Sequence, residues 1–207
     1  FEYASTLAQA FARFPVQFVV RPMTEAYHDY RGYAGKISSG TFNVGDSIRV
    51  LPTGQESTIA TIEKFDSKLE QAIAGDSVTI TLTTDIDISR GNTLVLASED
   101  QAPQLKDFSA QVCWLDHTAL TPGKTYLLQH GINMTKAKIS QITERLDVAT
   151  QTATEGVSSL QLNEIGTIAL RTAQPIAADQ YAANPANGAF ILIDEFSNST
   201  VGVGFVK

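Results

Sequence analysis

Cysteine is nearly absent from this sequence. Cys113 is the single one among 207 residues, so no disulfide can form within the chain. That fits a reducing compartment, because disulfides form and persist mainly in oxidising ones. No apolar run approaches the ~20 residues that a membrane-spanning helix needs, and the basic-then-apolar start of a secretory signal is missing. We therefore expect a cytoplasmic protein that has no membrane partner.

Positive charge is also scarce. The formal net charge is −7, from 15 Lys and Arg against 22 Asp and Glu, and the basic residues are scattered along the chain. Non-specific binding to nucleic acid or to acidic lipid requires a basic surface. The charge balance argues against nucleic acid as a partner, although it does not exclude a local basic patch.

Spacings typical of catalytic and metal sites are missing as well. His28, His117 and His130 lie far apart in sequence, and no Cys-x-x-Cys or His-x-x-x-His pair is present. We interpret these histidines as surface or turn residues, and Cys113 beside Trp114 as a core thiol rather than a nucleophile. No Gly-x-Ser-x-Gly surrounds a serine. We predict no catalytic, cofactor-binding or metal-binding residue in this chain.

One stretch at first suggests a nucleotide site. Residues 121–127 read TPGKTYL and contain the Gly-Lys-Thr with which a phosphate-binding P-loop ends. A P-loop has another glycine five residues before that one, but Thr118 stands there. The loop must also lead into a helix, whereas the residues after Lys124 continue with a β-type pattern. We interpret Pro122-Gly123 as a turn into a strand.

Residues 85–91 (DIDISRG) resemble the start of a calcium-binding loop. Such a loop has glycine at its sixth position and glutamate at its twelfth. Arg90 and Leu96 occupy these positions here, and an arginine among the ligands would repel the ion. We interpret the stretch as a solvated turn between strands.

What the sequence has in quantity is β-strand pattern. In residues 77–84 (SVTITLTT), Val78, Ile80 and Leu82 alternate with threonines, which predicts a half-buried strand. Gly, Pro, Asn and Asp separate the candidates, as turns require. Further strands are expected at 13–20, 30–38, 46–51, 57–65, 92–97, 107–116, 124–131, 135–148, 166–172, 188–194 and 199–206. Many short strands with almost no helix predict an all-β barrel or sandwich protein.

A polar stretch at 98–107 (SEDQAPQLKD) divides the chain into near-equal halves. We predict a first β-barrel over residues 13–98 and a second over 106–207, each with about six strands, enough for a small closed barrel. The alternative is a single large β-domain.

Residues 1–12 carry Tyr3, Leu7 and Phe11 at helical spacing, and we expect a short helix, a linker or a remnant of the expression vector there.

Glycines recur every five residues in the stretch 31–54, at Gly35, Gly40 and Gly45, and Gly45-Asp46 is followed by Leu51-Pro-Thr-Gly54. Each glycine falls where a strand would end or bend. This pattern resembles the second domain of the translation-factor GTPases, the barrel that follows the GTP-binding domain in elongation factor Tu.

Other stretches narrow the resemblance. They are RFPVQFVVRP (13–22), RGYAG (31–35), DIDISRGN (85–92), PGKTYLLQHG (122–131), LNEIG (162–166), AQPIAADQY (173–181), GAFILID (188–194) and TVGVG (200–204). Together they resemble the large, GTPase subunit of bacterial sulfate adenylyltransferase (ATP sulfurylase), from about residue 13 to the end of the chain.

The resemblance implies two consecutive antiparallel β-barrels of the elongation factor Tu domain 2 and domain 3 type. In the parent subunit an N-terminal domain would bind GTP and Mg²⁺. A small catalytic subunit would make adenylyl sulfate from ATP and sulfate, with GTP hydrolysis helping to drive this step of sulfate assimilation. These 207 residues contain no P-loop, no Asn-Lys-x-Asp motif and no adenylyl-sulfate kinase domain. GTP and Mg²⁺ are therefore assigned to an absent domain, and the chain alone is expected to lack activity.

The chain begins with Phe rather than Met, which predicts a processed product or a fragment. Its expected partners are its own N-terminal GTPase domain and the small catalytic subunit. The turns at 27–30 and 85–90 are candidate contact segments. Two alternatives stay open: RNA- or protein-binding barrels of another translation-type GTPase, and a free-standing adaptor of two barrels.

Overall fold

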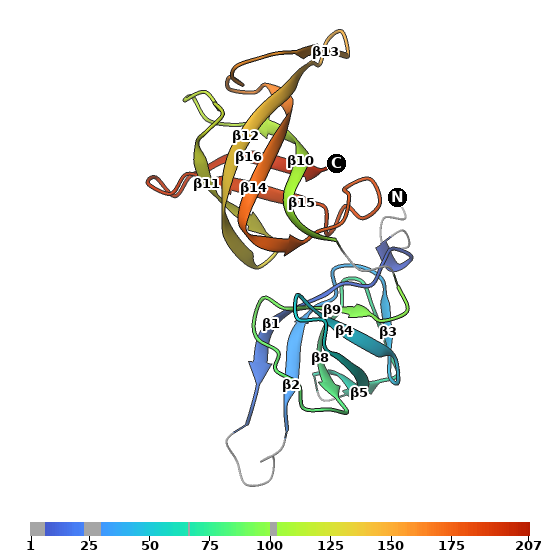
Figure 1. Cartoon of the computed structure of the whole chain (residues 1–207). Coiled ribbons are helices and arrows are strands. Elements are labelled where there is room, and N and C mark those ends of the chain that lie inside the picture. The colour runs from blue at the N-terminus through green and yellow to red at the C-terminus, as the bar shows by residue number, and fades with distance from the viewer. Residues whose placement is uncertain (1–6, 23–29, 66, 100–102) are drawn as a thin grey trace. The chain divides into compact units, whose positions relative to one another are not determined.

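The computed structural model describes residues 7–22, 30–65, 67–99 and 103–207 (Figure 1). These residues form β-strands joined by turns, apart from the helical residues 7 and 8. The chain divides into two units, Phe1–Ala102 and Pro103–Lys207. The fold is therefore all-β, as the alternation of apolar and polar residues predicts.

The first unit contains a closed antiparallel barrel. Six strands follow each other in the order β4-β9-β1-β2-β8-β5, and the pairing of β4 with β5 closes the ring. β6 extends the sheet beside β5, and β3 pairs with β7 in a small separate sheet. The strands are β1 (Phe14–Val20), β2 (Gly32–Lys36), β3 (Thr41–Asn43), β4 (Ser47–Leu51), β5 (Glu56–Lys64), β6 (Ser67–Leu69), β7 (Gln71–Ile73), β8 (Ser77–Leu82) and β9 (Thr93–Leu96).

Alternation along the strands fills this barrel with apolar side chains. Val78 and Ile80 of β8 are buried, whereas Thr79 and Thr81 between them face outward and are half-buried. Other strands contribute Phe14 and Phe42, whose rings meet edge to face with centroids 6.3 Å apart. Closure of the ring pairs both edges of its six strands, which limits the unpaired backbone that could aggregate.

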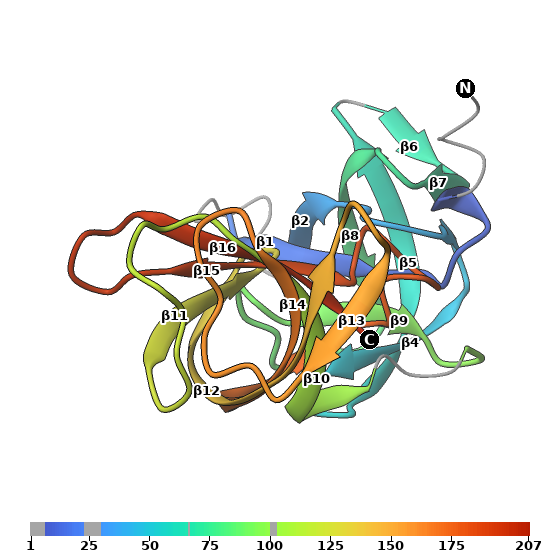
Figure 2. The same cartoon turned by 90° about the horizontal axis from the view of Figure 1, so that it is seen from above.

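The second unit contains another closed antiparallel ring, in the order β11-β15-β16-β10-β14-β12, with β11 paired to β12. Figure 2 looks onto this ring, and β12 continues past it into a ribbon with β13. The strands are β10 (Gln104–Trp114), β11 (Thr125–His130), β12 (Asn133–Asp147), β13 (Thr152–Glu155), β14 (Ile165–Ala177), β15 (Ala189–Ile193) and β16 (Thr200–Val206).

The core of the second barrel is built around Trp114, which is 1% exposed. Its ring meets that of Tyr126 edge to face at 5.4 Å, and its Nε1 donates a hydrogen bond to the Thr118 carbonyl at 2.8 Å. Cys113, the neighbour of Trp114, faces the opposite side of β10 and is half-buried. The expectation of a core thiol is therefore wrong, because successive side chains of a strand point to opposite faces.

The TPGKTYL stretch is a turn into a strand, as predicted. Gly123 has a φ of +89°, and β11 begins two residues later, at Thr125. The Gly123 amide donates to the Ile139 carbonyl at 2.8 Å, so this backbone N–H belongs to the barrel rather than to a phosphate cradle. No helix follows, and the P-loop interpretation has no structural support.

The short strands β3, β6, β7 and β13 were not among the expected strands, because three or four residues hardly show an alternation. At the start of the chain, Tyr3 lies outside the described residues. Ala12 is fully buried in the core of the first barrel, and the Arg13 amide bonds to the Ser39 carbonyl. These last residues before β1 thus pack as part of the barrel.

Candidate functional site

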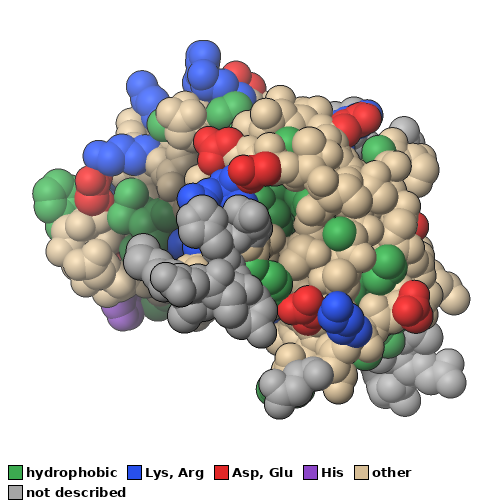
Figure 3. All heavy atoms as spheres, turned by 90° about the horizontal axis from the view of Figure 1, so that it is seen from below, with side chains coloured by type: hydrophobic (Ala, Val, Ile, Leu, Met, Phe, Trp, Pro, Cys, Tyr) green, Lys and Arg blue, Asp and Glu red, His purple; other side chains and the backbone are tan. Residues whose placement is uncertain are grey.

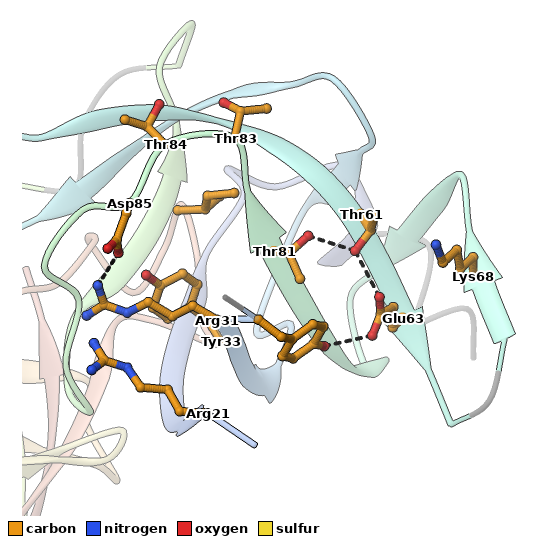
Figure 4. Close-up of a pocket in the computed structure, with 12 residues that line it drawn as sticks. Arg21, Arg31, Tyr33, Thr61, Glu63, Lys68, Thr81, Thr83, Thr84 and Asp85 are labelled. Carbon is orange, nitrogen blue, oxygen red and sulfur yellow. Dashed lines mark hydrogen bonds and ion pairs between the residues drawn. The ribbon is translucent and has the colours of Figure 1, made fainter. Parts of the chain in front are cut away.

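A polar pocket of about 720 Å³ opens on the outside of the first barrel (Figure 4). It lies where β2, β5 and β8 meet the loop that follows β8. Its lining consists almost entirely of polar and charged side chains: Arg21, Tyr30, Arg31, Tyr33, Thr61, Glu63, Lys68, Thr81, Leu82, Thr83, Thr84 and Asp85. Such a lining suits a polar or charged ligand, or a polar segment of a partner protein.

The wall on the β5 and β8 side follows from the register of the two strands. Thr61 pairs directly with Thr81, and their hydroxyl oxygens are 2.7 Å apart. Both side chains face outward because Ile62 and Ile80, their neighbours in sequence, fill the core. Threonine fits here because its branched side chain suits a strand while its hydroxyl stays available at the surface.

Glu63 is held in place from two sides. The Tyr30 hydroxyl donates to its Oε2 at 2.8 Å, and the Thr61 hydroxyl donates to its Oε1 at 3.1 Å. Burial of the phenol, together with the hydrogen bond and the charge of Glu63, raises the pKa of Tyr30 to about 12. Tyr30 therefore stays protonated at neutral pH and remains a donor.

Arg31 joins the opposite wall to the loop after β8. Its guanidinium bonds to Asp85, lies 3.5 Å from Asp87, and stacks 5.7 Å from the centre of the Tyr33 ring. Burial would lower the pKa of Arg31, but the hydrogen bond to Asp85 and the nearby charges outweigh it and raise that pKa. The side chain is 17% exposed, and its buried Nε has no hydrogen-bond partner among the residues described.

Arg21 and Lys68 bring further positive charge to the pocket. In Figure 4 the Arg21 guanidinium lies on the same side as that of Arg31, close to Tyr33. Neither Arg21 nor Lys68 has an ion-pair partner in the described part of the chain. At one end of the pocket the two arginines could bind a carboxylate or a phosphate. At the other end Glu63 could accept hydrogen bonds from a ligand.

The pocket brings together Tyr30 and Asp85, one residue from each segment predicted to make contacts. Residues 27–29 of the first segment lie outside the described residues. Ile88 of the second is 2% exposed and packs in the core, and Arg90 donates to the Gln17 carbonyl at 2.9 Å. Asp85 and Asp87 thus pair with Arg31, which gives these two residues of the DIDISRG stretch a structural role.

Sequence reasoning missed Thr61, Glu63 and Arg31 as members of a site. Arg31 belongs to the RGYAG motif, which was the available signal. Thr61 and Glu63 read as ordinary outward residues of a strand, and only the register against β8 places them beside Tyr30.

Histidine and acidic residues form no metal centre in the residues that the structure describes. His130, expected at the surface or in a turn, is instead buried at the end of β11, with 7% exposed. Its Nε2 donates to the Asn187 carbonyl at 2.9 Å, because a carbonyl can only accept. Burial lowers the pKa of His130, so the ring is neutral at pH 7. No helix in the described ranges is long and apolar enough to cross a membrane.

The surface charges are mixed in sign. On the face drawn in Figure 3, Lys and Arg side chains lie in small groups with Asp and Glu close to them. Residues far apart in sequence can nevertheless meet on one sheet. A common groove on the second barrel is lined by Lys106, Lys136, Lys138 and Arg171. Basic residues that are scattered along the sequence therefore lie together on this surface.

Comparisons with known proteins agree with the two-barrel architecture. Residues 33–95 match the family model "Elongation factor Tu domain 2", and residues 107–207 match "GTP-eEF1A C-terminal domain-like". Sulfate adenylyltransferase subunit 1 of Cellvibrio japonicus (strain Ueda107) is 42% identical over 194 residues, which are 94% of this chain and 40% of that protein. The chain thus spans less than half the length of this relative.

Solved structures share the fold. Crystal structures of sup35 with GMPPNP and with GDP superpose with TM-scores of 0.82 and 0.81, at 20% and 19% identity. Each comparison covers 96% of this chain and 47% of the other. At such identities the likeness concerns the fold alone. The predicted resemblance to the sulfate adenylyltransferase subunit and the predicted pair of barrels are both confirmed.

Proposed function

Because its two barrels match family models of translation-factor GTPase domains, we propose that the chain is the non-catalytic, C-terminal portion of a sulfate adenylyltransferase GTPase subunit. Its role there would be to couple GTP hydrolysis in a preceding domain to the synthesis of adenylyl sulfate by a partner subunit. The observation that carries this proposal is the 42% identity across 94% of the chain. The proposed location is the cytoplasm.

Coupling requires contacts that differ between two states. The pocket on the first barrel offers a suitable contact, because its central ion pair is exposed on one side only. Asp85 is 81% exposed whereas Arg31 is 17% exposed. A carboxylate of the GTPase domain or of the partner subunit could replace Asp85 on Arg31 in one state and release the loop after β8. Because water screens the exposed Arg31–Asp85 ion pair, breaking it costs little free energy.

The first test concerns the chain by itself. Calorimetric titration with GTP and Mg²⁺ should give no binding heat, because the proposal places the nucleotide in another domain. Tight GTP binding by these 207 residues would contradict that. The coding sequence upstream of Phe1 should contain Gly-x-x-x-x-Gly-Lys-Ser/Thr, and a stop codon directly upstream would contradict the proposed parent.

The second test concerns coupling. In the complete subunit assembled with its small partner, Arg31→Gln should lower GTP-dependent adenylyl sulfate synthesis while GTP binding stays unchanged. Arg49→Gln is the matched control, since Arg49 also pairs with a carboxylate, Glu56, at 2.6 Å but lies away from the pocket. Equal effects of the two variants would argue against a role of the pocket in coupling.

The alternative function is RNA or protein binding by barrels of another translation-type GTPase, and the shared fold with sup35 keeps it open. A filter-binding assay with transfer RNA at physiological salt separates the two. The net charge of −7 favours no binding. Tight, saturable binding of transfer RNA would favour the alternative.

A further inference from the structure

A second site lies on the outer face of the second barrel and is independent of the function proposed above. There a shallow groove of about 310 Å³ crosses β10, β11, β12 and β14. Four of its seven lining residues are basic and none is acidic: Lys106, Thr125, Lys136, Lys138, Arg171, Thr172 and Ala173. In a chain of net charge −7, this concentration of positive charge runs against the overall balance.

The strand register forces two of these charges together. Lys138 of β12 is the direct cross-strand partner of Arg171 of β14. Like charges directly opposite each other in an antiparallel pair destabilise the sheet. Asp107, opposite Arg171 on the other side, compensates only in part, because its carboxylate is 3.6 Å from Arg171 Nε and both side chains are mostly exposed.

An irregularity in β10 adds another charge. The pairing of β10 with β14 shifts register between Leu105 and Asp107, and Lys106 sits at the shift. The buried hydroxyl of Thr172 lies 3.3 Å from the Lys106 carbonyl and donates to it. Such bulges re-aim a side chain, and this one lets Lys106 and the neighbouring Asp107 both lie exposed on the barrel surface.

Two of the four cations have no counter-charge in the described part of the chain. Lys136 pairs with Glu195 at 2.8 Å and Arg171 with Asp107, but no hydrogen bond or ion pair of the Lys106 or Lys138 side chain is found. The seven lining residues therefore present N–H donors of four basic side chains, two of them without a counter-charge, and include no carboxylate. A complementary ligand must concentrate acceptors and negative charge in a small volume.

We propose that this groove binds a diphosphate group. A volume near 310 Å³ is at the lower limit of small-molecule sites and suits a compact ligand. Lysines act as point charges on phosphate oxygens, and Arg171 adds a planar fork of donors. A diphosphate placed between Lys138 and Arg171 would relieve their mutual repulsion and would also engage Lys106.

The probe for this proposal is inorganic pyrophosphate, titrated calorimetrically into the 207-residue chain at low ionic strength. Saturable one-site binding is expected. Lys138→Gln and Lys106→Gln should each weaken it about fivefold, as the loss of one partly screened charge contact does. Lys36→Gln, which removes an exposed lysine on β2 of the other barrel, should leave it unchanged.

Two further ligands test the chemical class. ADP carries the same diphosphate group. If ADP binds as tightly as pyrophosphate or more tightly, the proposal is supported and the natural ligand is a nucleotide rather than free pyrophosphate. Hexaglutamate carries several carboxylates, and equal affinity for it would overturn the diphosphate assignment. Absence of pyrophosphate binding, or equal losses in Lys36→Gln and Lys138→Gln, would overturn the site. Unchanged thermal unfolding of each variant checks that the barrels stay intact.

Discussion

The Tyr30 hydroxyl donates a hydrogen bond to the Glu63 carboxylate at 2.8 Å, between residues separated by 33 positions in the chain. Tyr30 stands just before β2 and Glu63 lies near the end of β5, so this bond ties two parts of the pocket together. Because Thr61 donates to the other carboxylate oxygen, Glu63 is held from two sides.

Tyr30→Phe should lower the free energy of unfolding by about 1–2 kcal/mol, since the hydrogen bond that it removes ends on a charged acceptor. Urea denaturation at pH 7 measures this difference. Glu63→Gln is the companion variant, because an amide oxygen can still accept from Tyr30 and the loss should be smaller. An unchanged midpoint in Tyr30→Phe would mean that the bond contributes nothing in solution.

Stability should also fall at alkaline pH. Tyr30 and Tyr126 each have a pKa raised to about 12, with burial as the largest cause, from the ordinary value of 10.0. The unfolded state loses these protons first, so the stabilisation is complete below pH 10 and is lost as the pH rises toward 12. Tyr126→Phe should show a shallower decline of unfolding free energy over this interval than the wild type. Identical slopes would contradict the raised pKa.

An opposite dependence is expected at acidic pH from His130. Burial lowers its pKa below the ordinary 6.5, so below that pH the unfolded state binds a proton that the folded state does not. The contribution is therefore present above pH 6.5 and is lost as the pH falls. Urea denaturation at pH 7.5 and 5.5 should show a smaller loss for His130→Gln than for the wild type, and an equal loss would refute this origin.

The stretch AQPIAADQY, one of the motifs behind the resemblance, contains Asp179, the acceptor of a buried polar network. Asp179 is 6% exposed, and its Oδ2 accepts from the side-chain amides of Asn184 and Asn187, both at 2.9 Å. Asp179→Ala would leave two buried donors without this acceptor and should cost about 3 kcal/mol. Asp179→Asn retains one acceptor oxygen and should cost less. Thermal or urea unfolding of both variants measures these losses. If Asp179→Ala were as stable as the wild type, the network would not stabilise the fold.

Local patterns predicted most of the strands, and the number of strands in each half predicted a closed barrel, but not which strands pair to close it. The alternation in SVTITLTT is sufficient to identify β8 and its inward residues, because one face is buried and the other is not. Nothing in that pattern states that β4 pairs with β5 to close a ring. The barrel prediction depended on the number of strands in each half, and the family resemblance added the type of barrel.

The sites follow the same division. Tyr30 and Asp85 could be suggested from sequence because polar and aromatic residues gather in turns. Lys106, Lys138 and Arg171 could not, since they come from three separate strands and meet only through register. Cys113 and His130 were misassigned because one residue of shift along a strand exchanges the buried and the exposed face.

The glycines that recur every five residues have two different physical reasons, which can be separated by experiment. Gly40 has a φ of +72°, and a Cβ there would lie 2.3 Å from the Cα of Ala12. Gly45 has a φ of +89°, but a Cβ would meet nothing within 4 Å.

Gly45→Ala should therefore cost only the ~1–2 kcal/mol of a left-handed backbone. Gly40→Ala adds a clash with the backbone of Ala12, which packs in the barrel core and cannot easily move, and should destabilise by at least ~3 kcal/mol. Thermal unfolding of the two variants measures the difference. Equal losses would show that the close approach of residue 12 to Gly40 does not persist in solution.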